Sequence, residues 1–192
     1  MLPLGDFSMP SSAVATISVR NAIRRFRRNR RGSAAVEFAL IAPVFFALLF
    51  AIIETGLMFF ADQVLETGTQ DSARLMYTHQ AYDTGMDETA FKTDLCSRIS
   101  ALFNCTGNLA SLTVDVQYYA PGAAINLADP IVSGSLSGTF TYQVPPPGSA
   151  NTVVVRVYYQ WPLYVTGLGF NIANLNGSKR LLAATAAFHV EP

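Results

Sequence analysis

The sequence has few charged residues and very few histidines and cysteines. Charged residues make up 14% of its 192 residues, against about a quarter in a typical globular domain. A deficit of this size indicates that part of the chain lies in a membrane. The two histidines, His79 and His189, have no acid–base partner nearby in sequence, and two cysteines without clustered histidines do not make a zinc site. The sequence also has no P-loop, G-x-S-x-G or H-E-x-x-H motif. It therefore predicts no metal, no cofactor and no enzymatic activity.

Positive charge is concentrated near the start of the chain. Seven of the thirteen basic residues lie between Arg20 and Arg31, and the next long stretch, from Phe38 to Ala61, has Glu54 as its only charge. At about 1.5 Å per residue this stretch can cross a ~30 Å hydrocarbon core. It is too long for a secretory signal and no A-x-A site closes it. Because basic flanks stay in the cytoplasm, everything after about residue 62 is predicted to lie outside. The membrane-length neighbour favours this topology over nucleic-acid binding, the other common use of an arginine run.

The residues around Gly32 form a motif with a physical rationale. The basic stretch ends at Gly32, small residues occupy positions 33–35, and Glu37 and Phe38 open the apolar run. A glycine lets the backbone enter a narrow protease site. A carboxylate at the edge of an apolar helix is costly unless it finds a partner. The combination resembles the processing site of type IV prepilins, and within them the TadE-like minor pseudopilins of the Tad (Flp) branch.

The resemblance implies a role in pilus assembly, priming or capping, without catalysis. Prepilin peptidase would cut after Gly32 and leave Ser33 as the first mature residue. Glu37 would pair with the N-terminal amine of a neighbouring subunit, and Phe38 stands at the family's aromatic position. The partners would be the membrane, the peptidase, other pilin-like subunits and Tad assembly proteins, with no nucleic acid. The N-terminus would be cytoplasmic and the C-terminal domain periplasmic, anchored in a bacterial inner membrane. Incorporation into an extracellular pilus stays open.

The likeness continues along the helix, where Ala73-Arg74 fits the family pattern, and is looser over residues 152–190. The alternative to a processed prepilin is an uncleaved, single-pass membrane anchor whose outer domain binds a ligand or partner.

The chain is expected to have three parts and an α+β, pilin-like fold. These parts are a cleaved leader (1–32), a transmembrane helix (33–62) and an extracytoplasmic domain (63–192). Apolar and small residues at steps of three and four predict that the helix continues to Asp83 and stops at Gly85. A second helix is predicted over 87–103, with Asp87 as its N-cap.

Four strands of a small antiparallel sheet are predicted from alternating or β-branched runs. They span 112–119, 138–144, 152–160 and 181–190. The prolines at 145–147 predict a turn that joins the second and third strands as a hairpin, and Trp161-Pro162 is expected to break the third. The segment 163–178 reads as a loop with exposed apolar side chains, which either covers the core or contacts a membrane or partner.

Three further residues have open roles. Cys96 and Cys105 could form a disulfide in an oxidising compartment, or stay as two buried thiols. Glu54 could pair with another subunit, or lie near the outer headgroups and reach water.

Overall fold

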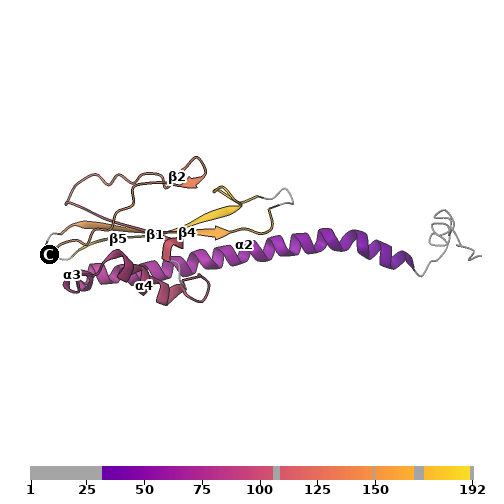
Figure 1. The fold of residues 1–192 in the computed structure, drawn as a ribbon, viewed down its shortest axis with the longest axis horizontal. Coiled ribbons are helices and arrows are strands. Elements are labelled where there is room, and N and C mark those ends of the chain that lie inside the picture. The colour runs from indigo at the N-terminus through magenta and orange to yellow at the C-terminus, as the bar shows by residue number, and fades with distance from the viewer. Residues whose placement is uncertain (1–31, 106–108, 149, 167–170, 191–192) are drawn as a thin grey trace, which may run out of the picture. The chain divides into compact units, whose positions relative to one another are not determined.

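The computed structural model describes residues 32–105, 109–148, 150–166 and 171–190 (Figure 1). The chain divides into two compact units, residues 1–46 and 47–192. Apart from Gly32, the predicted leader lies outside the described residues. In the first unit, the described part beyond Gly32 is helical and belongs to α2.

Helix α2 runs from Ser33 to Tyr77 and contains Pro43. The prediction that it continues to Asp83 is wrong, because the backbone turns at His79, which has a left-handed φ of 60°. A separate turn of helix, α3 (Gln80–Asp83), follows. Gly85, with φ of 62°, then ends it as predicted, and the next N–H, of Met86, donates to the Ala81 carbonyl (2.8 Å).

Helix α4 spans Glu88–Ile99. Its predicted N-cap is confirmed, since the Asp87 carboxylate accepts a hydrogen bond from the backbone N–H of Ala90 (2.7 Å). The helix ends before the predicted residue 103. Phe91, Leu95 and Ile99 of the helix are fully buried, and Phe103 beyond the helix end is 3% exposed. A short 3₁₀ turn, η2 (Leu109–Ser111), leads into the sheet.

The main sheet has three antiparallel strands in the order β1-β4-β5. They span Leu112–Tyr119, Thr152–Pro162 and Lys179–His189. The predicted first, third and fourth strands are thus confirmed. β4 does not break at Trp161 as expected: Trp161 pairs with Arg180 and Pro162 with Lys179. Proline is tolerated there because it is the last position of the strand.

The predicted strand at 138–144, and its hairpin with the third strand, are wrong. β4 lies between β1 and β5, so both of its edges are taken. Tyr142 makes only an isolated parallel bridge to Val116, at the free edge of β1. The connection between β1 and β4 instead contains a small hairpin that was not predicted. It is formed by β2 (Ile131–Val132) and β3 (Ser135–Leu136).

The helices cover one face of the sheet, and the connection with β2 lies over the other (Figure 1). The core between the helices and the sheet combines Leu65 and Met76 of α2, Phe91 and Leu95 of α4, and alternate residues of the strands. Leu112, Val114 and Val116 point into it as their alternation predicts, whereas Tyr118 is 39% exposed.

The opposite face of the sheet carries a buried ion pair. Asp115 is 1% exposed and accepts hydrogen bonds from Nε and Nη2 of Arg156 on the neighbouring strand. The same carboxylate accepts from the backbone N–H of Thr141 (2.9 Å), and Arg156 donates to the Ala128 carbonyl (3.2 Å). The pair therefore fastens the connection between β1 and β4 to the sheet.

Candidate membrane and assembly surface

The predicted processing residues lie at the beginning of α2. Gly32 comes directly before the first helical residue, Ser33. A Cβ added to Gly32 would have no heavy atom within 4 Å. Glu37 and Phe38 both lie at exposed positions of the helix, and the Phe38 ring is 67% exposed. Among the described residues, the backbone at Gly32 and the Phe38 ring are thus at the surface.

The following part of α2 exposes large apolar side chains on every side. Among the described helices, it is the one long and apolar enough to cross a membrane, with a mean hydropathy of 2.6 in its most apolar window. Successive residues such as Phe45, Phe46, Leu48 and Leu49 are all at least 38% exposed. A surface like this is unfavourable in water and suited to lipid or to other apolar helices. The exposed large residues from the helix start through its apolar part are Val36, Phe38, Leu40, Ile41, Val44, Phe45, Phe46, Leu48, Leu49, Phe50, Ile52, Ile53, Leu57, Phe59 and Phe60.

The packed part of α2 begins before the apolar run ends. Met58 is 7% exposed and Ala61 fully buried, and both belong to the core formed with α4 and the sheet. Leu57 and Phe60, on the other side of the same turns, remain about half exposed. The folded domain therefore starts inside the segment predicted to span the membrane.

Glu54 has a partner within its own chain. Its carboxylate accepts hydrogen bonds from the backbone N–H groups of Tyr164 and Val165, the latter at 3.0 Å. Both belong to the apolar segment that follows β4. Neither expectation for Glu54 included this contact, and no local sequence pattern could have revealed it, because the residues are 110 and 111 positions apart.

Helices α2 and α4 meet along a seam of small residues. A Cβ on Gly68 would lie 2.5 Å from Cγ2 of Ile99, so only glycine fits there without displacement. One turn later, Ser72 donates to the Asp94 carboxylate (2.8 Å). Leu65, Gly68 and Ser72 are among the apolar and small residues at steps of three and four that predicted the helix here, and all three are buried.

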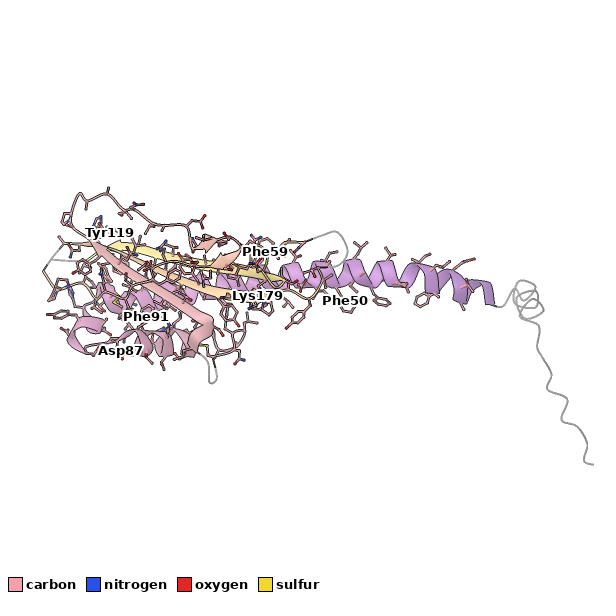
Figure 2. All side chains as sticks on the ribbon, turned by 45° about the horizontal axis from the view of Figure 1, so that its top comes forward. Phe50, Phe59, Asp87, Phe91, Tyr119 and Lys179 are labelled. Atoms are coloured by element: carbon pink, nitrogen blue, oxygen red, sulfur yellow. A yellow bond between two sulfur atoms is a disulfide. The ribbon has the colours of Figure 1, made fainter. Side chains whose placement is uncertain are left out.

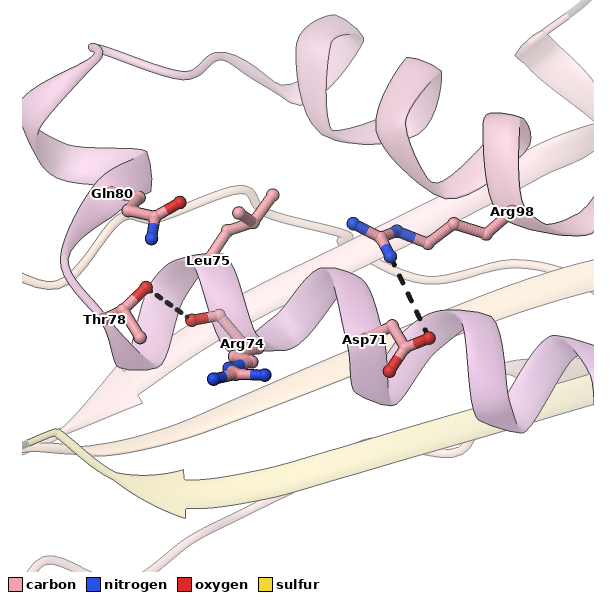
Figure 3. Close-up of a pocket in the computed structure, with 6 residues that line it drawn as sticks. All are labelled: Asp71, Arg74, Leu75, Thr78, Gln80 and Arg98. Carbon is pink, nitrogen blue, oxygen red and sulfur yellow. Dashed lines mark hydrogen bonds and ion pairs between the residues drawn. The ribbon is translucent and has the colours of Figure 1, made fainter.

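A hollow of about 320 Å³ lies beside this seam, where α2, α3 and α4 meet (Figure 3). Arg98 reaches across it to Asp71 (3.9 Å) and donates to Asp94 from Nε (3.0 Å) and Nη2 (3.2 Å). The hydrogen bond to Asp94 raises the pKa of Arg98. Arg74 of the Ala73-Arg74 pair also lines the hollow. The Arg98 charge is thus matched within the chain, so this hollow reads as a solvated helix junction.

The cysteines are bonded to each other, and the histidines lie at structural positions of the fold. Cys96 and Cys105 form a disulfide with a Cα–Cα distance of 5.8 Å, which ties α4 to the segment before η2. His189 Nδ1 lies 3.1 Å from the Thr152 hydroxyl across β4 and β5, and His79 occupies the bend between α2 and α3. Within the described ranges, no group of His, Cys, Asp and Glu could hold a metal ion.

Comparison with known families finds a match over the N-terminal part. Residues 32–74 match the TadE-like protein family. The match begins at Gly32, includes Glu37 and Phe38, and ends at Arg74, so the resemblance predicted from the sequence is confirmed for this segment. The match covers less than half of the chain, and the apolar helix within it fits a membrane anchor. Comparisons with curated proteins and with solved structures gave no significant match.

Proposed function

We propose, on the premise of this TadE-like segment, that the chain is a minor pilin or pseudopilin of a Tad (Flp) type IV pilus. In this proposal prepilin peptidase removes residues 1–32, and the mature protein acts in assembly, priming or capping of the filament. The observation that carries the proposal is the coincidence at Gly32. The family match begins at Gly32 and α2 at the next residue, and the large apolar residues of this helix are exposed through Leu57.

The exposed helix supplies the assembly surface. Before assembly it spans the bilayer, where its apolar side chains face lipid at little cost. In a filament the same side chains would pack against helices of other subunits, by close contact and not by a further gain of burial from water. The cut exposes the amine of Ser33, and the Glu37 carboxylate of a neighbouring subunit is the proposed partner for that positive charge.

The domain after Ala61 would remain outside the inner membrane. Its disulfide supports this side, because disulfides persist in oxidising compartments such as the periplasm. The arginines at 20–31 support the opposite, cytoplasmic side for the leader.

Cleavage can be tested at Gly32 without disturbing the fold. We would express the full chain with and without a prepilin peptidase and determine its N-terminus by mass spectrometry. The expected new N-terminus is Ser33. In the variant Gly32→Leu the leader should stay attached, because the side chain obstructs the peptidase site while the folded protein has open space around it.

The matched control is Gly56→Leu, on the same helix and also with nothing within 4 Å of its added Cβ. It should be cut like the wild type. An intact leader in the presence of active peptidase would refute the pilin pathway. The protein would then be the uncleaved, membrane-anchored binding domain.

A further inference from the structure

The segment after β4 contacts α2 at a position that comes before the end of the apolar run. This segment, residues 163–166, is named here the Tyr164 loop. Leu163 anchors it, since its side chain is 6% exposed and its N–H donates to the Ser178 carbonyl (2.9 Å). The next two N–H groups donate to Glu54. Glu54 lies eight residues before Asp62, the first charged residue after it, which is about 12 Å along a helix.

In a lipid environment, neither water nor a neighbouring strand is available to hydrogen-bond the polar groups of this contact. The contact supplies those hydrogen bonds. A carboxylate near hydrocarbon needs donors, and free backbone N–H groups there are costly. Glu54 and the two amides meet these requirements for each other. Charge-assisted hydrogen bonds of this kind are among the stronger ones in proteins.

The surroundings of the contact are apolar and exposed. On α2, Ile53, Leu57 and Phe60 are 47–58% exposed at the same level. On the loop, the Tyr164 ring is 85% exposed, the largest exposure among the large apolar or aromatic side chains of the described residues. The sequence has no charged residue from position 157 to position 178. Tyrosine is enriched where a protein meets the membrane–water interface, because its ring is apolar and its hydroxyl polar.

A basic pair closes this uncharged stretch. Lys179 is exposed at the start of β5, paired with Pro162 directly before the loop, and Arg180 donates to the Ile172 carbonyl (2.8 Å). Figure 2 places Lys179 at the same end of the domain as Phe59, and Tyr119 and Asp87 at the opposite end. Lys179 Nζ donates to Gln160 Oε1 (3.3 Å), and the residue stays exposed, so a lysine at this end of the domain suits the level of lipid phosphates.

We propose that the Tyr164 loop is a membrane-contacting surface, which enters the interfacial region of the outer leaflet of the bilayer that α2 spans. Glu54 holds the loop at that depth, and the exposed Lys179 lies at the same end of the domain. The domain is thus seated in the membrane surface and not carried above it on a free helix. The inference rests on the membrane anchoring within the proposed function, and its partner is the phospholipid bilayer.

The first test measures contact with lipid through a single tryptophan. The chain has one tryptophan, Trp161, which we would replace in the double variant Trp161→Phe, Tyr164→Trp. The control double variant is Trp161→Phe, Tyr82→Trp, because Tyr82 is also exposed (49%) but lies on α3, at the far end of the domain. Each full-length protein is placed in vesicles of phosphatidylcholine and phosphatidylglycerol with or without bromine at carbons 6 and 7 of the acyl chain.

The expected result is that brominated lipid removes most of the fluorescence of Trp at position 164 and leaves that at position 82 unchanged. Flotation of the same vesicles reports anchoring separately. Protein that floats but shows no quenching at position 164 would overturn the loop proposal and leave the anchor intact. Protein that does not float would overturn the membrane anchor itself.

A second test uses the wild-type chain and does not depend on those variants folding. Vesicles carry a phospholipid with a photoreactive headgroup, and crosslinked tryptic peptides are mapped by mass spectrometry. Trypsin releases residues 157–179, which contain the loop, and residues 75–92, which contain Tyr82. Crosslinks should concentrate in the first peptide. Equal labelling of both peptides, or no labelling of the first, would overturn the proposal.

Discussion

Two stretches of the single helix α2 lie in opposite surroundings. From Phe38 to Ile53 the large residues are exposed, whereas from Ala61 to Met76 one broad face is buried by α4 and the sheet. The buried stretch does not have the larger apolar side chains. Besides Leu65 and Met76, its buried residues are small or carry a hydroxyl: Ala61, Gly68, Thr69, Ser72 and Ala73.

The difference shows how one helix can be suited to two environments, lipid along one stretch and a protein core along the other. In the first stretch, bulky side chains face outward because lipid is as apolar as they are. In the second, small side chains let a helix and a sheet approach closely, which gains contact and hydrogen bonds inside the folded domain. Hydrophobicity alone thus does not tell which residues of α2 are in the core.

The largest effect should come from removing a core leucine of the second stretch. Leu65→Ala should lower the free energy of unfolding of the domain by about 2–5 kcal/mol, because Leu65 is fully buried. Leu57→Ala, at a half-exposed position two turns earlier, should change it far less. Denaturant titration in detergent micelles can follow both through Trp161, which packs against Phe103 (5.9 Å between rings). Equal losses for the two variants would contradict the division of α2 into two stretches.

The next largest effect should come from loosening α4, the helix that covers only the second stretch of α2. The disulfide closes a short loop, with Cys96 and Cys105 nine positions apart, and keeps the end of α4 against the core. Replacing both cysteines by serine should cost about 2–4 kcal/mol of stability. Reductant should destabilise the wild type by a similar amount and leave the double variant unchanged. Alkylation of both thiols in unreduced protein taken from its native membrane would show that the domain does not mature in an oxidising compartment.

The sequence predicts the elements of this fold well where local periodicity and burial agree. The face containing Leu65, Gly68 and Ser72, the N-cap Asp87, and three of the four strands follow from spacing alone. These positions are confirmed because each has one dominant requirement, to face the core or to cap a helix.

The prediction fails where a contact joins distant residues. Asp115 alternates with the core residues Val114 and Val116, and alternation alone would place it at the surface, yet it is buried by a pair with Arg156, 41 positions away. That pair fastens the connection over the sheet, where residues 138–144 were expected to form a strand. Glu54 is a similar case, since its partners lie more than a hundred residues away. Period-two alternation indicates a pleated face but not what covers it.

The smallest predicted effect is also the one whose sign distinguishes the two stretches. Gly→Ala within a helix normally stabilises, by about 0.5–1 kcal/mol, because alanine loses less backbone freedom on folding. Gly56→Ala should show this gain or no change, since its Cβ meets open space. Gly68→Ala should instead cost about 1–3 kcal/mol, as overpacking does.

The reason is the neighbour that the new methyl group meets. Cγ2 of Ile99, at 2.5 Å, branches directly from Cβ and cannot swing away as the end of a long side chain could. Either α4 moves off α2 or the Ile99 rotamer becomes strained, and both weaken the same seam that Ser72 and Asp94 hydrogen-bond across. The titration used for Leu65 measures both variants. If Gly68→Ala were as stable as Gly56→Ala, close approach of α4 would not be what distinguishes the second stretch of α2 from the first.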